Sequence, residues 1–168
     1  MRKLYLMLIP AACIFASCSK AVNTPGTTTT QNDQKAAQFA AALKNHKYKL
    51  VSFTSDKPID YMANDNETKA ETDLWAYVKE YVKDDVNQFN DNTVSIWQGT
   101  ARVAGKDGDV ITVAYGAQGK DAAVMLNFVD YDYEPMQYKL DKYDDTQFTV
   151  YIDGPSGSKL YSKFSRVN

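Results

Sequence analysis

From residue 86 to the end of the chain, apolar and polar residues alternate with a period of two, and short clusters of turn residues interrupt the alternation. This pattern is typical of half-buried β-strands. Residues 47–54 alternate in the same way and predict a first strand. The later apolar rows are Val94 and Ile96; Ile111, Val113 and Tyr115; Ala122, Val124, Leu126 and Phe128; Met136, Tyr138 and Leu140; Phe148, Val150 and Ile152; and Leu160 and Phe164.

Two segments have helical character instead. Residues 33–46 are rich in alanine with an apolar side, and Asp33 is suited to cap the helix. In residues 68–82, Thr68 and Glu71 fit a capping box, and the apolar residues that follow fall on one helical face. Trp75 lies on that face, where core packing is favoured over a ligand contact. We predict a loop at 56–66 and turns at 116–121, 144–145 and 153–158. Asp84 and Asp85 are expected to cap the turn into the strand that starts near Val86.

These elements predict a mainly β domain of about eight strands. Short connections favour antiparallel neighbours, and closing the sheet removes its exposed edges. We therefore expect an eight-stranded antiparallel up-and-down barrel of the lipocalin or calycin type, with an N-terminal helix and a second helix inserted after the first strand. A two-sheet sandwich is the alternative.

The first residues have the pattern of a secretory signal. Arg2 and Lys3 precede an apolar run at 4–14, which is shorter than the roughly 20 residues of a membrane span. The run ends at Phe15-Ala16-Ser17-Cys18, which resembles a bacterial lipoprotein lipobox. Cys18 is then the acylated first residue of the mature chain. Cys13, which also follows small residues, is a second candidate with a shorter apolar run before it.

The expected organisation has three parts. Residues 1–17 form a lipoprotein signal peptide, residues 18–34 a lipidated cysteine with a flexible tether, and residues 35–168 the β-barrel domain. The tether is rich in Thr, Asn and Gln and lacks periodicity. An additional edge strand is the other interpretation of this segment.

Charge and composition limit the kinds of partner and functional site that we expect for this chain. The formal net charge is −2, and it becomes −4 when the two positive charges of the signal segment are lost. No run of Lys or Arg remains, which argues against nucleic acid as a partner. No cysteine follows Cys18, and His46 is the single histidine. This inventory argues against zinc sites, Ser-His-Asp triads and Cys-His dyads. We expect no catalytic residue, no metal and no cofactor.

Three local patterns have a chemical alternative. Asp130, Asp132 and Glu134 share one face of an extended segment, where they would bind calcium or form a solvated acidic hairpin end, and the second is favoured. A paired-carboxylate glycosidase site needs a separation that sequence spacing does not establish. Residues 154–158 lack the Gly-x-Ser-x-Gly register, so Ser156 is expected in a turn. His46 is expected to contact the end of the first helix.

Two motifs carry a family resemblance. Residues 48–53, Tyr-Lys-Leu-Val-Ser-Phe, and residues 83–94, with two acids, a Phe and a turn into a strand, are together similar to the lipocalin-like lipoproteins of Bacteroidetes-type bacteria. The lipobox and the polar tether match that group as well. The resemblance covers roughly residues 48–168. It implies the barrel fold and no set of catalytic residues.

The aromatic residues indicate where a ligand would bind. The chain has 12 tyrosines, which combine apolar area with a polar group. Inside a barrel they would line a pocket for one small apolar or amphipathic molecule. Outside it, together with the predicted helix at 68–82, they would form a contact face for an envelope protein. We expect a non-enzymatic lipoprotein anchored to the membrane by its N-terminal lipid, with the periplasmic face of the outer membrane favoured over the cell surface. The expected ligand-binding residues are Tyr115, Leu126, Phe128, Tyr138 and Phe148.

Overall fold

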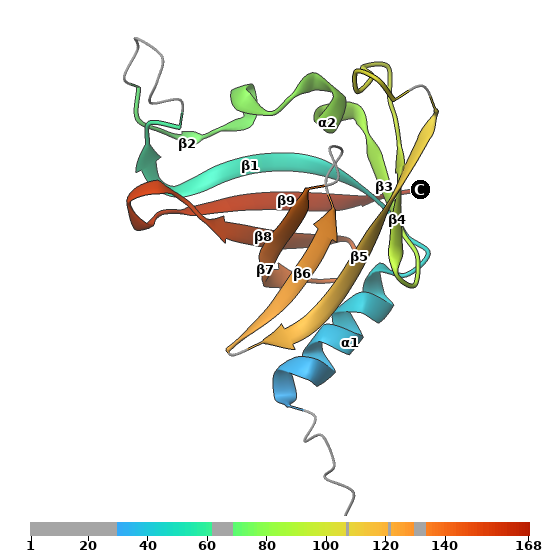
Figure 1. Cartoon of the computed structure of the whole chain (residues 1–168). Coiled ribbons are helices and arrows are strands. Elements are labelled where there is room, and N and C mark those ends of the chain that lie inside the picture. The colour runs from blue at the N-terminus through green and yellow to red at the C-terminus, as the bar shows by residue number, and fades with distance from the viewer. Residues whose placement is uncertain (1–29, 62–68, 107, 121, 130–133) are drawn as a thin grey trace, which may run out of the picture.

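A computed structural model describes residues 30–61, 69–106, 108–120, 122–129 and 134–168. It contains α1 (Gln31–Leu43), the short α2 (Glu80–Asp84) and nine β-strands (Figure 1). The strands are β1 (Lys47–Ile59), β2 (Glu71–Asp73), β3 (Val86–Phe89), β4 (Thr93–Trp97), β5 (Val110–Lys120), β6 (Ala123–Val129), β7 (Pro135–Tyr143), β8 (Gln147–Asp153) and β9 (Lys159–Val167). The predicted signal segment, Cys13, Cys18 and most of the tether lie outside the described residues. In the described part of the chain, no helix is long and apolar enough to cross a membrane.

All nine strands form one antiparallel sheet that closes in a ring. From β3 to β9 each strand pairs with the next one in the chain, and β1 closes the ring by pairing with both β3 and β9. β2 pairs with β1 and adds a short strand at the side of the ring. The predicted mainly β, antiparallel order is thus confirmed. The strand count differs, because β2 lies where a helix was predicted.

The predicted helix at 68–82 is wrong for most of its length. The chain instead forms β2, a 3₁₀ turn at Trp75–Tyr77 and the five-residue α2. Leu74 is fully buried, and its N–H donates to the carbonyl of Phe53 on β1. It packs with Ile59 and Leu160 in a second apolar cluster. Tertiary contacts with β1 therefore overrule the local helical pattern.

Three element boundaries also differ from the prediction. β1 runs to Ile59, because its last residue pairs with β2 at Glu71. β5 runs to Lys120 instead of turning at 116–121, since its final residues pair with β6. α1 begins at Gln31, so residues 31–34 of the expected tether are helical. Its cap is Thr30, whose hydroxyl accepts from the N–H of Asp33, while Asp33 accepts from the N–H of Thr30.

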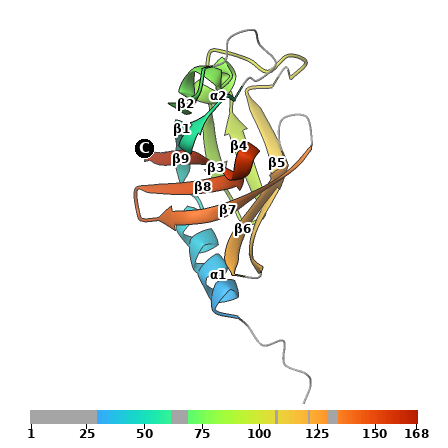
Figure 2. The ribbon, with the colours of Figure 1, turned by 90° about the vertical axis from the view of Figure 1, so that its left-hand side faces the viewer.

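α1 closes one end of the ring, and α2 lies at the opposite end (Figures 1 and 2). The buried side chains Ala36, Phe39 and Leu43 face into the ring. The ring of Phe39 packs 5.7 Å from Phe148, between ring centres. Phe148 also meets Tyr48 at 5.0 Å. These three packed aromatic side chains fill the half of the closed sheet that is nearest to α1.

The turn between β7 and β8 is fixed by one carboxylate. Asp144 accepts from the hydroxyl and N–H of Thr146 and from the side chain and N–H of Gln147. These bonds, that of the Thr146 hydroxyl first, hold the pKa of Asp144 at about 2. The predicted turn at Asp144 and Asp145 is confirmed, and its carboxylate stays charged as a local clamp.

Gly119 sets how closely α1 can approach the ring. A β-carbon at this position would overlap the backbone of Asn32 and Asp33 at the start of the helix. We expect Gly119→Ala to lower the free energy of unfolding by about 1–3 kcal/mol, because the helix must move away from β5. Chemical denaturation followed by circular dichroism measures the loss. Gly116→Ala on the same strand is the matched control, since a β-carbon there meets nothing within 4 Å. An equal loss in both variants would contradict this role of Gly119.

Candidate ligand-binding site

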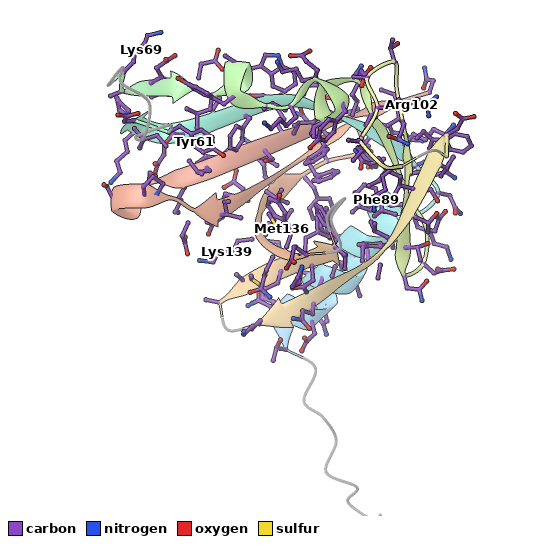
Figure 3. All side chains as sticks on the ribbon, turned by 45° about the horizontal axis from the view of Figure 1, so that its top comes forward. Tyr61, Lys69, Phe89, Arg102, Met136 and Lys139 are labelled. Atoms are coloured by element: carbon purple, nitrogen blue, oxygen red, sulfur yellow. The ribbon has the colours of Figure 1, made fainter. Side chains whose placement is uncertain are left out.

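The ring encloses a cavity of about 180 Å³, named here the inner cavity. It lies in the half of the ring away from α1, and its wall combines residues of β1, β3 to β9 and α2. In Figure 3, Phe89 and Met136 lie toward the middle of the ring and Lys139 lies at its outside. The lining residues are Leu50, Val82, Asn87, Phe89, Val94, Ile96, Val113, Phe128, Val129, Met136, Tyr138, Phe148, Ser162 and Phe164.

The inner cavity is apolar with a few polar groups. Asn87, Ser162 and Tyr138 supply hydrogen-bonding atoms, and among the described lining residues none carries a charge. Aromatic side chains form much of the wall: Phe148 stacks on Phe164 with ring centres 4.7 Å apart, and Phe128 stacks on Tyr138 at 5.1 Å. An apolar wall with few polar atoms is the usual composition of a small-molecule site.

The five residues expected to bind a ligand fall into two groups. Phe128, Tyr138 and Phe148 line the inner cavity. Leu126 does not, because it is fully buried in the packed core. Tyr115 also lies outside the cavity lining, since its ring packs 5.2 Å from that of Phe89, and burial raises its pKa. The structure thus brings three of the five together at the inner cavity, places Leu126 in the packed core and places Tyr115 beside a second hollow.

Sequence reasoning missed several lining residues. Met136 and Phe164 belong to predicted inward rows and could have been included on that ground. Asn87 and Ser162 are polar, yet each lies in the inward register, two residues before Phe89 and Phe164 respectively. A polar residue inside an apolar row was therefore an available signal. Val82 comes from α2, whose position depends on tertiary contacts.

A second hollow of about 280 Å³, named here the lateral hollow, lies at the side of the ring. Three consecutive residues from each of three neighbouring strands line it: Ala114, Tyr115 and Gly116 of β5, Asn127, Phe128 and Val129 of β6, and Pro135, Met136 and Gln137 of β7. Phe128, Val129 and Met136 line both spaces. The two spaces are therefore separated by a shared wall of side chains.

Two adjacent carboxylates hold the end of the ring near α2. Asp85 is 0 % exposed and accepts from the N–H of Gly99 at 2.9 Å. Asp84 accepts from the N–H groups of Thr100 and Ala101 at 2.7 and 3.0 Å. The pair was expected to cap the turn into β3, but it binds the chain that follows β4. We name this contact the Asp84–Asp85 clasp, and it fixes α2 and hence Val82 at the cavity.

The other chemical candidates show no assembled site in the described residues. No group of three or more metal-ligating side chains occurs there. Asp130 and Asp132 lie outside the described residues, and Glu134 is exposed. Ser156 lies in the expected turn, where its carbonyl accepts from Lys57. The Trp75 ring lies 5.7 Å from the ammonium of Lys83 and does not line the inner cavity.

β7, β8 and β9 lie side by side in the sheet (Figure 2). Their outer face carries lysines around a pair of tyrosines. The rings of Tyr151 and Tyr161 are 5.5 Å apart. Lys139 and Lys159 lie 5.8 and 4.8 Å from the centre of the Tyr151 ring. Lys163 lies two residues further along the same face of β9. We name these five residues the lysine–tyrosine face.

Comparison with known proteins returns no counterpart: no protein family, no curated protein and no solved structure matches the chain.

Proposed function

We propose that this chain is a membrane-anchored, lipocalin-like lipoprotein that binds a small apolar or amphipathic molecule inside its ring and performs no catalysis. The observation that carries the proposal is the inner cavity, an apolar space of about 180 Å³ at the centre of a closed sheet. Eight strands, β1 and β3 to β9, make up the ring. That number fits a lipocalin-like up-and-down barrel able to hold one small ligand.

The size of the inner cavity limits what it holds. An apolar cavity of about 150 Å³ stays dry and takes up benzene. At about 180 Å³, the inner cavity suits a molecule or molecular fragment little larger than that. The apolar wall favours binding of a hydrocarbon group, because burial of that group in the cavity removes its apolar surface from water. A charged group would lose its hydration without gaining an ionic partner.

The anchoring part of the proposal depends on the N-terminal sequence. Acylation of Cys18 would tether the domain to the outer membrane, with the periplasmic side favoured. Stable anchoring takes about two lipid signals, which a multiply acylated cysteine supplies. Metabolic labelling of cells with a clickable palmitate analogue tests this point. The Cys18→Ser protein should carry no label, and the Cys13→Ser protein should be labelled like wild type.

A cavity-filling variant tests ligand binding. Ser162 is buried and lines the inner cavity, so Ser162→Leu extends a side chain into that space. We expect residues 19–168, which contain every described contact, to bind toluene in calorimetric titration, and Ser162→Leu to bind it at least tenfold more weakly. Ser165→Leu, on the outward face of the same strand, is the matched control and should bind like wild type. Failure of wild type to bind toluene would contradict the proposal.

The second candidate function is that of an accessory lipoprotein that docks on an envelope protein. The lysine–tyrosine face favours it, because tyrosine is enriched at protein interfaces and the lysines around the pair would complement an acidic partner surface. Residues 68–82, predicted as a helix of that contact face, do not form one helix, since β2, a 3₁₀ turn and α2 occupy the described part of this segment. Crosslinking in cells distinguishes the two functions: a partner lost in Lys159→Glu but kept in Ser162→Leu would favour docking.

A further inference from the structure

Building on the proposed ligand-binding function, we propose that the ligand of the inner cavity is an uncharged molecule that carries hydrogen-bonding groups. Asn87 and Ser162 are the residues that bind those groups. The class of ligand and two specificity-determining side chains are thereby assigned to the site. A pure hydrocarbon would leave both side chains without a partner at the centre of the ring.

The side chain of Ser162 belongs to the inner face of β9. It is 8 % exposed and lines the inner cavity. The residues two positions to either side also face inward, since Leu160 is buried and Phe164 lines the cavity. By register, Ser162 lies opposite Phe53 of β1 and Val150 of β8, whose side chains contain no hydrogen-bonding group. The Ser162 hydroxyl therefore lies among apolar neighbours on this face of the sheet.

Asn87 has the same kind of position on β3. Two residues further along the strand, Phe89 lies toward the middle of the ring (Figure 3). By register, Asn87 lies opposite Tyr48 of β1 and Ile96 of β4, both of which are buried. The hydroxyl of Tyr48 already donates to the carbonyl of Ala42 in α1. The amide of Asn87 thus interrupts an apolar row on the inner face, and Asn87 lines the inner cavity.

Within the described part of the chain, neither of these two side chains has a hydrogen-bond partner. The fully enclosed side-chain atoms that lack a partner there are the Ser55 hydroxyl and one oxygen of Asp84. The polar atoms of Asn87 and Ser162 therefore border open space, and the space that both residues line is the inner cavity. Polar groups inside proteins are nearly always paired, because an unpaired one costs free energy. Two unpaired polar side chains at one apolar cavity point to hydrogen-bonding groups on the molecule that fills it.

The two side chains determine which groups the ligand can carry. A serine hydroxyl donates one hydrogen bond and accepts two, and an asparagine side chain has two N–H donors and a carbonyl acceptor. A hydroxyl, ketone or amide group can pair with either residue. A carboxylate, phosphate or ammonium group lacks an opposite charge, because no described residue of the lining is charged, and a buried unpaired charge is costly. The ligand is therefore a mainly apolar, neutral molecule with hydroxyl or carbonyl groups.

The unliganded protein should be no less stable without this pair of polar groups. An amide and a hydroxyl that lack a partner in an apolar space are unfavourable for folding. The double variant Asn87→Leu/Ser162→Ala removes both polar groups and keeps a side chain of similar size at position 87. We expect its midpoint of urea denaturation to equal or exceed that of wild type. A midpoint below that of wild type would show that the pair supports the fold, and would overturn its assignment to a ligand.

Calorimetric titration of residues 19–168 with toluene, p-cresol and p-toluate tests the ligand class, because the three probes share one ring and differ in one substituent. We expect wild type to bind p-cresol at least as tightly as toluene, and to bind p-toluate at least about tenfold more weakly than p-cresol. The double variant should bind p-cresol at least about tenfold more weakly than wild type does, and toluene within about threefold of wild type.

The matched control is Gln88→Leu/Ser165→Ala. Gln88 follows Asn87 on β3, Ser165 lies three positions after Ser162 on β9, and neither lines the inner cavity. The same types of substitution are thus made on the outward face of the same strands. We expect this control to bind all three probes like wild type.

The contradicting outcomes separate the two proposals. Unchanged p-cresol affinity in the double variant would overturn the assignment of Asn87 and Ser162. Binding of p-toluate as tight as that of p-cresol would overturn the uncharged class of ligand. If wild type binds toluene and rejects p-cresol, the cavity accepts hydrocarbon alone, which overturns the ligand class and keeps the proposed function. If wild type binds none of the three probes, the proposed function fails as well.

Discussion

Phe148→Ala is expected to lower the free energy of unfolding by about 3–5 kcal/mol, which is the usual cost of removing a fully buried phenylalanine. Phe148 is 1 % exposed, and its ring meets those of Phe39, Tyr48, Phe89 and Phe164. It therefore joins the packed half of the ring under α1 to the wall of the inner cavity. Urea denaturation followed by tryptophan fluorescence and circular dichroism measures the change.

Phe164→Ala is the matched control for this prediction. Phe164 stacks on Phe148 from the neighbouring strand but is only partly buried, since it faces the inner cavity. We expect its removal to cost about half as much, because fewer contacts are lost. If Phe164→Ala were as destabilising as Phe148→Ala, the cavity would not lie beside Phe164 as described.

Asp85→Ala is expected to cost about 2–3 kcal/mol of unfolding free energy. The buried Asp85 carboxylate accepts the Gly99 N–H, and its removal leaves that donor without its acceptor inside the protein. The variant also frees α2, so toluene affinity should fall together with stability because Val82 lines the inner cavity. Denaturation and calorimetric titration measure the two effects.

Two variants control the Asp85 prediction. Asp85→Asn keeps an acceptor oxygen for Gly99 and should lose about half as much stability. Asp91→Ala removes a carboxylate that is 78 % exposed and paired with Lys44 on the surface, so it should change stability little. A loss for Asp85→Ala no larger than that for Asp91→Ala would show that the Asp84–Asp85 clasp does not hold this end of the ring.

Much of the sheet could be predicted from the sequence because several strands, β5 above all, have one buried and one exposed face. Rows such as Ile111, Val113 and Tyr115 alternate with exposed residues, and the structure buries all three. A strand with one face toward the inside of the ring and the other toward solvent takes this period. The order of strands followed from the short turns between them, since short connections favour antiparallel neighbours.

The segment at 68–82 could not be predicted, because its apolar residues serve two different contacts. The N–H of Leu74 donates to β1, and its side chain packs in the second apolar cluster. Val82, in contrast, lines the inner cavity. A helical pattern in sequence assumes that these residues share one partner surface. Because these partners are two separate parts of the structure, the segment does not form one continuous helix between them.

The candidate site was predictable in part. Alternation identifies which residues point inward, and so it found Phe128, Tyr138 and Phe148. It does not distinguish a residue beside the inner cavity from one elsewhere, and Leu126 in the packed core and Tyr115 beside the lateral hollow are of the second kind. That distinction depends on where α1 enters the ring, because its side chains fill one half and leave the other open.

Native mass spectrometry of the protein purified from its own cell membranes tests whether the inner cavity holds a ligand. We expect wild type to carry a bound small molecule with an apolar chain and Ser162→Leu, purified in the same way, to carry none. A wild-type protein with only the mass of its own acylated chain would contradict ligand binding in the inner cavity, as would a bound molecule that persists unchanged in Ser162→Leu.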